Sequence, residues 1–249
     1  MLLIREGYLL TEIPPTPEKI VERKTIVYKT LVDPTIVKLT GEKMKNKMFA
    51  KFGLLKPKPE DIRCVSIDKY YEPYIIADGK YTIDYYRKRV YTIEVDEEVR
   101  EVIILNHTFK PEAPEERPKK PQRVVKLEAE ERLSYEDKAY LILDRIGREV
   151  ALEQMPSAPS EDKPEEILAE IEEKVRKLEM APNKEINILK SKIVKRPPDI
   201  KRVVEELFEV SERAIIYTPV YEIAFENVRS GEVKTVEMDG VTAKMLLHE

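Results

Sequence analysis

Side chains that commonly act as nucleophiles, general bases or metal ligands are sparse in this chain. It has one cysteine, Cys64, and two histidines, His107 and His248. No Ser-His-Asp, Cys-His or H-E-x-x-H arrangement can be built from these residues, and a single cysteine forms neither an internal disulfide nor a cysteine-based zinc site. The seven glycines are scattered and form neither of the common phosphate-binding loops. We therefore expect no catalytic residue of these classes, no bound metal and no cofactor.

Two carboxylates and a lysine match, in residue type and spacing, the active-site pattern of a metal-dependent nuclease. Such enzymes hold Mg²⁺ with an Asp and a second acid, and a nearby Lys helps to place the attacking water. Asp199 could supply the first carboxylate, and Glu232 and Lys234, two residues apart, could supply the rest. Asp199, however, lies at an expected helix start, and Glu232 and Lys234 fit the solvent face of a hairpin. Nuclease activity is therefore the third of three functional hypotheses.

Aromatic and basic residues gather in one short stretch. Seven of the thirteen tyrosines lie between residues 70 and 91, around a run of three basic residues. Aromatic rings can stack on bases while cations bind phosphates, so this stretch could bind nucleic acid. Alternating polarity predicts a hairpin in which Tyr81, Tyr85 and Tyr91 face the core, and cross-strand aromatic packing is the alternative interpretation of the cluster. The exposed candidates at the hairpin tip are Tyr86, Arg87, Lys88 and Arg89.

The sharpest charge feature is the segment 38–58, which holds seven lysines and one acid, Glu42. Within it, residues 43–55 mix lysines with Met, Phe and Leu, so they could lie on an anionic membrane surface or enter a groove of a partner. The alternative is a solvated loop that its Phe and Leu side chains hold to the rest of the protein. The candidate binding residues are Lys43, Lys45, Lys47 and Lys51.

Composition narrows the class of protein. Charged residues make up 37% of the chain, and the net charge is −4. This net acidity counts against a dedicated nucleic-acid binder, and many Lys and Glu with few amide side chains are typical of hyperthermophile proteins. No apolar run approaches the roughly 20 residues that span a bilayer, and the first apolar run is too short for a signal peptide. We expect a cytoplasmic protein.

Two strand endings resemble each other, Thr92–Asp96 and Thr235–Asp239. Each follows a stretch that contains Tyr and Pro, and each precedes an apolar pair at the same distance. We therefore expect a small β-meander at each end of the chain, the first turning at Asp78-Gly79, a dipeptide suited to a tight hairpin. The two terminal Asp residues then lie where strands meet turns, which favours a scaffold role over a pair of catalytic carboxylates.

The middle of the chain is expected to be helical. Residues 110–123 contain four prolines and no apolar pattern, which predicts an extended linker. Ser134 with Asp137 predicts a capped helix, a second helix starts at Pro164, and a third starts at Pro198. The second helix carries a short coiled-coil seam that needs a partner to be stable. The seam residues are Leu168, Ile171, Val175 and Leu178.

Local propensity predicts the remaining short elements. Thr16-Pro17-Glu18 indicates a helix start, because Thr caps well and Pro suits the first helical position. Strands are expected at 25–28, 34–40, 99–105 and 186–194, where β-branched and apolar residues dominate.

Together these patterns predict an α+β protein with two small antiparallel β-meander modules joined by a Pro-rich linker and a helical arm. Residues 1–110 would form a β-rich module, 111–125 the linker, 126–196 the helical arm and 197–249 a helix plus a three-stranded meander. We expect a non-enzymatic adaptor or assembly subunit that contacts a protein partner or a second copy of itself. The alternatives are a nucleic-acid-binding accessory protein and the Mg²⁺-dependent nuclease.

Overall fold

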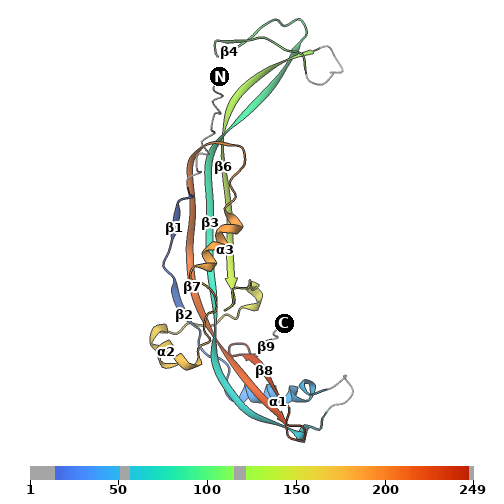
Figure 1. The fold of residues 1–249 in the computed structure, drawn as a ribbon, viewed down its shortest axis with the longest axis vertical. Helices are drawn as coiled ribbons and strands as arrows, with labels where there is room; N and C mark the ends of the chain where they lie inside the picture. Colours follow the sequence, from blue (N-terminus) through green and yellow to red (C-terminus); the bar gives the residue numbers. More distant parts are fainter. Residues whose placement is uncertain (1–14, 51–56, 115–121, 247–249) are drawn as a thin grey trace, which may run out of the picture. The chain divides into compact units, whose positions relative to one another are not determined.

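The computed structural model describes residues 15–50, 57–114 and 122–246, and it confirms the α+β class (Figure 1). The strands are β1 Glu18–Ile20, β2 Lys24–Val27, β3 Ile62–Asp96, β4 Val102–Ile104, β5 His107–Phe109, β6 Gln122–Leu143, β7 Ile200–Asn227, β8 Val233–Asp239 and β9 Met245–Leu246. The helices are α1 Pro34–Met48, α2 Pro164–Glu170 and α3 Lys184–Ile193, with 3-10 turns at Pro59–Asp61, Leu152–Gln154 and Glu172–Lys174.

The chain divides into two compact units, and each unit is assembled from separated stretches of sequence. Of the described residues, unit 1 takes 15–19, 81–114, 122–137 and 194–208, and unit 2 takes the remainder. The contiguous ranges expected from the sequence differ from this arrangement, because β3, β6 and β7 each contribute residues to both units.

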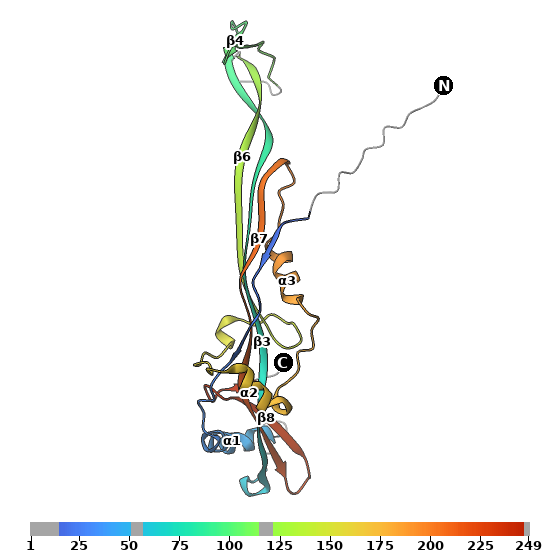
Figure 2. The same ribbon diagram turned by 90° about the vertical axis from the view of Figure 1, so that its left-hand side faces the viewer.

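The strands form one mixed sheet in the order β6-β3-β7-β8-β9, with β1 and β2 also paired to β7 (Figures 1 and 2). The pairing of β2 with β7 is parallel, and that of β7 with β8 is antiparallel, with Tyr221 opposite Met238. A separate two-stranded sheet joins β4 to β5. The strand expected at 25–28 is present as β2, close to its expected bounds. In the region of the expected C-terminal meander, β8 is a separate strand, whereas the strand before it is the end of β7, which begins at Ile200.

Helix α1 replaces the strand expected at 34–40. Asp33 caps it by accepting a 2.7 Å hydrogen bond from the Thr35 backbone N–H, and Pro34 occupies the first turn, where its missing N–H costs nothing. Val37 is fully buried in the core of unit 2, which also contains Ile223 and Phe225 of β7. The expected strand is wrong because the cap and proline signal outweighed the β-branched residues Thr35, Ile36 and Val37.

Gly79 does not form the expected hairpin turn, because β3 runs through it without a break. Its φ is not positive, and its role is a close approach between strand and helix. A Cβ placed on Gly79 would lie 2.6 Å from Leu189 Cδ2 of α3 and 3.1 Å from the Glu209 carbonyl oxygen. Glycine therefore lets α3 pack directly on β3. The expected first meander is wrong for the same reason, and so is the strand expected at 186–194, which is α3.

Two predicted helices are strands. Residues from Ser134 to Leu143 belong to β6, and those from Ile200 onward belong to β7. In β6, even-numbered residues from 126 to 138 are exposed and the odd-numbered ones between them are half-buried. This period of two is the signature of a strand with one solvent face, and it overrides the isolated capping pattern.

The predicted seam helix is short and does not present a continuous apolar stripe. Helix α2 ends at Glu170, with Ile171 as its C-cap. It packs against β2. Val175 then forms an isolated parallel bridge with Tyr71 of β3. The seam residues are thus half-buried inside unit 2 rather than arranged along one helix.

The N-terminal segment also differs from its prediction. Glu18 starts strand β1 instead of a helix, and the Phe208 backbone N–H donates a 2.9 Å hydrogen bond to the Pro17 carbonyl. The expected strand at 99–105 shortens to β4. Residues 1–14, and residues 115–121 of the expected Pro-rich linker, lie outside the described residues.

Candidate functional site

Unit 1 is built largely from strand residues 81–96 of β3, 122–137 of β6 and 200–208 of β7, which we call the ribbon. Its buried core is small. It contains the apolar and aromatic residues Tyr81, Ile83, Tyr85, Val124, Val125 and Phe208. Tyr81 also makes an edge-on contact with Tyr135, with ring centroids 6.2 Å apart. The prediction that Tyr81 and Tyr85 face the core is confirmed, whereas Tyr91 is exposed.

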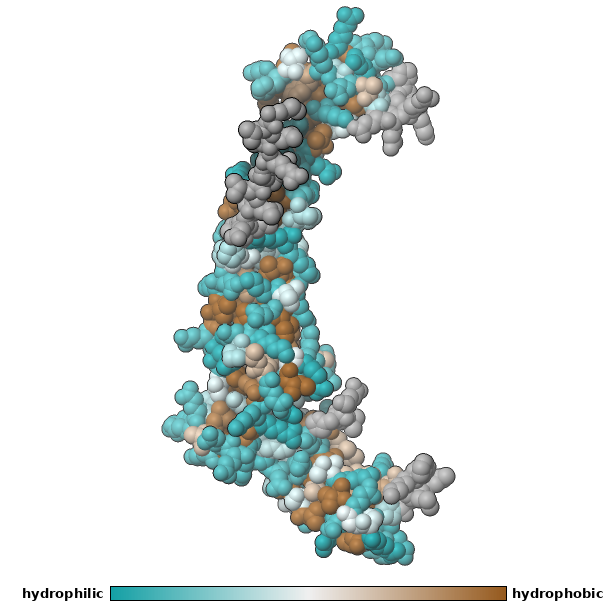
Figure 3. All heavy atoms as spheres, in the orientation of Figure 1, coloured by the Kyte–Doolittle hydropathy of each residue, from teal (hydrophilic) through white to brown (hydrophobic). Residues whose placement is uncertain are grey.

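Beyond this core the ribbon exposes apolar side chains. On β7, Val203 and Val204 are 42% and 46% exposed, and β3 exposes Val90, Tyr91 and Ile93. The β4–β5 hairpin, also in unit 1, exposes Ile103 at 68% and the adjoining Leu105 at 90%. The surface seen in Figure 3 is mostly hydrophilic, with apolar patches between the charged side chains.

Charged pairs cross the face of the ribbon on which the even-numbered side chains of β6 lie, which we call the even-numbered face. Arg132 of β6 donates a 2.8 Å hydrogen bond to Asp84 of β3, and Lys201 of β7 pairs with Glu130. The Arg202 guanidinium lies 3.8 Å from the same Glu130 carboxylate. Hydrogen bonds from Ser134 and Arg132 hold the pKa of Asp84 below its ordinary value. This face therefore carries an ordered pattern of charges.

The opposite face is organised around Glu131. Arg87 donates a 2.7 Å hydrogen bond to its carboxylate, and the Tyr91 hydroxyl donates another. Hydrogen bonds from Tyr91 and then Arg87 hold the pKa of Glu131 below its ordinary value. Arg87 also reaches Asp199 at 3.3 Å. The alternation of polar and apolar residues in β6 is the sequence signal that could have placed Glu131 on the half-buried face. A carboxylate on that face needs hydrogen-bond donors or a cation.

At the edge of the core of unit 1, Glu206 accepts four hydrogen bonds. Tyr81 and Thr16 donate to Oε1 at 2.8 and 3.0 Å, and Arg196 donates at 2.7 Å to Oε1 and 2.5 Å to Oε2. Burial alone would raise the pKa of Glu206, but the bonds from Arg196, Tyr81 and Thr16 outweigh it and lower that pKa. Both carboxylate oxygens of Glu206 are therefore hydrogen-bonded to residues of unit 1.

Unit 2 contains a second charge cluster, centred on Arg176. Its guanidinium donates to Glu237 at 2.7 Å and to Glu72 at 3.2 Å, and it stacks 3.8 Å from the Tyr70 ring centre. Burial raises the pKa of Glu72 despite the nearby Arg176 and Arg145. The Tyr70 hydroxyl is buried without a hydrogen bond of ordinary geometry, and burial and then Glu237 raise its pKa. These interactions hold residues 171–180 against the sheet.

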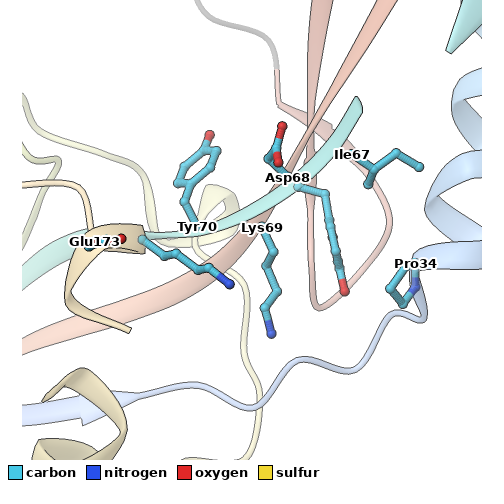
Figure 4. Close-up of a pocket in the computed structure, with 8 residues that line it drawn as sticks. Pro34, Ile67, Asp68, Lys69, Tyr70 and Glu173 are labelled. Carbon is cyan, nitrogen blue, oxygen red and sulfur yellow. The ribbon is translucent and has the colours of Figure 1, made fainter. Parts of the chain in front are cut away.

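Two hollows lie beside this cluster within unit 2. The smaller, of about 510 Å³, is shown in Figure 4 with Pro34 on one side, Glu173 on the other and residues 67–70 of β3 between them. The larger, of about 880 Å³, is lined by paired charges such as Asp144 with Arg148 and Arg145 with Glu72. In the described residues no group of three or more His, Cys, Asp or Glu is placed to hold a metal ion.

The aromatic and basic candidates lie inside strand β3 rather than at a hairpin tip. Arg202 covers Tyr86, with 4.2 Å between the guanidinium carbon and the ring centre, and Arg87 is held by two carboxylates. Lys88 and Arg89 are exposed. The structure therefore leaves two of the four candidates open to solvent and uses the other two within the ribbon.

The lysine candidates lie on α1, apart from Lys51, which is outside the described residues. Lys43 and Lys47 are exposed, one turn apart on the helix. Lys45 instead donates a 2.9 Å hydrogen bond to the Ile62 carbonyl. Phe49 is buried in the core and holds this segment to unit 2, but the segment is a helix and not the solvated loop of the alternative interpretation. None of the helices in the described residues is long and apolar enough to cross a bilayer.

The three residues of the nuclease hypothesis serve other contacts. Asp199 belongs to unit 1, where it accepts from Arg87. Glu232 and Lys234 belong to unit 2, where the Lys234 ammonium donates a 2.8 Å hydrogen bond to the Met48 carbonyl and lies 3.4 Å from Glu232. Asp239 accepts from the backbone N–H groups of Val241 and Thr242, both at 2.7 Å. Asp239 therefore stabilises a turn at the end of β8, where the sequence placed a turn.

Comparison with protein-family models, with curated proteins and with solved structures found no match.

Proposed function

We propose that this protein is a non-enzymatic assembly subunit, and that the ribbon of unit 1 is the surface through which it binds other protein chains. The observation that supports this proposal is the exposure of apolar side chains on both β3 and β7 of the ribbon. Val203 and Val204 are neighbours in sequence, so they point to opposite faces and both faces carry apolar surface. A strand that serves only its own fold usually buries one face.

The small core of unit 1 supports the same proposal. Narrow β-ribbons are marginally stable in water, because they bury little apolar area against the conformational entropy of ordering the chain. Beyond Tyr85 the strand β3 has no fully buried residue in the described part of unit 1. Contact with another chain would cover the exposed valines and isoleucines and would add the missing apolar burial.

Light scattering during size-exclusion chromatography tests the proposal. We expect the wild-type chain to associate with itself or to co-purify with another chain from its native host. Val203→Thr with Val204→Thr keeps β-branched side chains in the strand but removes apolar surface, so the association should weaken roughly tenfold or more. Val65→Thr in unit 2 is the matched control, because Val65 is a similarly exposed β3 residue at 48%. A strictly monomeric wild type with no co-purifying chain would overturn the proposal.

Nucleic-acid binding is the second candidate, and α1 is the observation that favours it. The helix presents Lys43 and Lys47 to solvent one turn apart, and its first turn contains no acid. A helical row of ammonium groups can follow a phosphate backbone. The net negative charge of the chain and the pairing of Arg87 with Glu131 rank this function below assembly.

A further inference from the structure

We propose that the partner of the ribbon is a second copy of this chain, and that two β6 strands pair antiparallel, edge to edge, about a two-fold axis at Glu131. This inference rests on the proposed function, because it names the chain that the ribbon binds. Among the described residues, β6 is the last strand of the sheet on its side, next to β3 (Figure 2). A long edge strand offers a row of backbone N–H and C=O groups to another strand.

Backbone geometry shows which residues face the open edge. Val124 exchanges both of its backbone hydrogen bonds with Glu112, at 2.7 and 2.9 Å, so these groups point away from β3. Because strand residues alternate, the N–H and C=O groups of even-numbered residues after Val124 point the same way. Two copies would therefore pair even-numbered residues with even-numbered residues, which limits the registers that can form.

The charges on the even-numbered face select one of these registers. With the axis at Glu131, Lys126 lies opposite Glu136 and Glu130 lies opposite Arg132, and the symmetry makes each pair twice. Moving the axis to Arg132 places two arginines opposite each other and Glu128 opposite Glu136. With the axis at Glu130 two glutamates also meet, and on the even-numbered face only Glu128 and Arg132 form opposite-charge pairs. Opposite charges across strands stabilise pairing and like charges oppose it, so the Glu131 register is favoured.

Intrachain pairs extend this pattern. Lys201 already pairs with Glu130, and Arg132 already pairs with Asp84. In the Glu131 register, a row of alternating charge would run from Lys201 and Glu130 of one copy to Arg132 and Asp84 of the second copy. Charged residues on a sheet edge usually prevent pairing, but the order of charges here permits pairing with the same strand reversed.

The odd-numbered face adds apolar contacts in the same register. Leu127 would lie opposite Tyr135, and Ala129 opposite Leu133, which are aliphatic and aromatic pairs of the kind that stabilise sheets. The two Glu131 carboxylates would meet at the axis, each still bound by Arg87 of its own copy. Removal of this like-charge contact should therefore strengthen the dimer.

Disulfide trapping tests the register directly. In a Cys64→Ser background, Glu131→Cys should oxidise readily to a covalent dimer, because directly opposite residues have Cα atoms close enough for a disulfide. Ala129→Cys and Leu133→Cys should each trap poorly alone, yet a mixture of the two should give a covalent heterodimer. These two variants are the matched controls, since they lie on the same face of the same strand.

Charge exchange gives a second test that does not depend on oxidation. Arg132→Glu and Glu130→Arg should each weaken self-association roughly tenfold or more, because each creates two like-charge pairs. Mixed together, the two chains should form a heterodimer, because every exchanged charge then meets its opposite. Glu131→Gln should tighten the wild-type dimer, and rising salt should weaken it.

The outcomes separate this inference from the proposed function. A dimer that Glu131→Cys does not trap, and in which the exchanged chains do not prefer each other, would overturn the β6 pairing and leave ribbon-mediated assembly intact. A monomer that co-purifies with a different chain would do the same. Trapping at Glu131 together with heterodimer selection would support the inference.

Discussion

The hydroxyl of Tyr81 donates a 2.8 Å hydrogen bond to the Glu206 carboxylate, and so joins the aromatic core of unit 1 to a nearly buried charge. The Glu206 side chain is 4% exposed and also receives the Arg196 guanidinium. A carboxylate in this position stabilises the fold only while it is ionised and all its donors are in place.

We expect Glu206→Gln to lower the free energy of unfolding by about 3 kcal/mol at neutral pH, because it leaves Arg196 without its charged partner. The pKa of Glu206 is lowered in the folded protein. Its contribution is therefore fully present above the ordinary unfolded value of about 4.3 and is lost as pH falls through the folded pKa. Urea denaturation of both proteins from pH 3 to 7 measures the difference, which should shrink at the acid end. Glu205→Gln, exposed on the same strand, is the control, and equal losses for both variants would contradict the prediction.

Gly79→Ala should destabilise the protein by about 1–3 kcal/mol, because the added methyl group would lie 2.6 Å from Leu189 Cδ2. Leu189→Ala alone should cost about 2–5 kcal/mol, since it opens a cavity under α3. The double variant should cost less than the sum of the two, because the smaller side chain at position 189 makes room for the methyl group. A double-mutant cycle by urea denaturation checks this, and simple additivity would argue against the close packing of α3 on Gly79.

Arg176→Ala should cost about 3–5 kcal/mol, because it leaves Glu72 and Glu237 without their shared cation in a partly buried cluster. Arg176→Lys should recover only part of this loss, since a lysine lacks the planar fork and stacks less well on Tyr70. Arg63→Ala provides a matched control. Its pair with Glu226 is exposed, so its loss should cost less than about 1 kcal/mol. Thermal and urea unfolding of the three variants give the ranking, and similar losses for Arg63 and Arg176 would refute it.

For the nucleic-acid alternative, Lys43→Glu with Lys47→Glu should abolish any salt-sensitive binding of single- or double-stranded DNA or RNA. Removing one ammonium–phosphate interaction should reduce the slope of log affinity against log salt by about 1. Lys174→Glu with Lys177→Glu makes the same change of net charge on other exposed lysines and is the control. Anisotropy titrations at several salt concentrations measure these slopes. Absence of binding by the wild-type protein would remove this function.

Local sequence patterns predicted the α+β class, the strand at 25–28, and the burial of Tyr81 and Tyr85. The strand at 25–28 was predicted from its β-branched residues. The burial of the two tyrosines was predicted from alternation, which directly reflects a strand with one covered face. The helices predicted from the capping signals at Ser134 and Pro198 were wrong, because a cap residue contributes only a weak local preference for a helix. A strand that pairs along its full length gains far more from its ladder of hydrogen bonds and from burial.

The sequence by itself determined where side chains alternate, where charges gather and that the usual catalytic motifs are missing. Only the tertiary structure decided that β3 continues through Gly79, that Glu206 collects Tyr81 and Arg196, and that β6 lies at the edge of the sheet. The reason is physical. Burial and strand order depend on contacts between residues as far apart in the chain as Tyr81 and Glu206, and a pattern read along neighbouring residues carries no information about which distant strand will lie beside it.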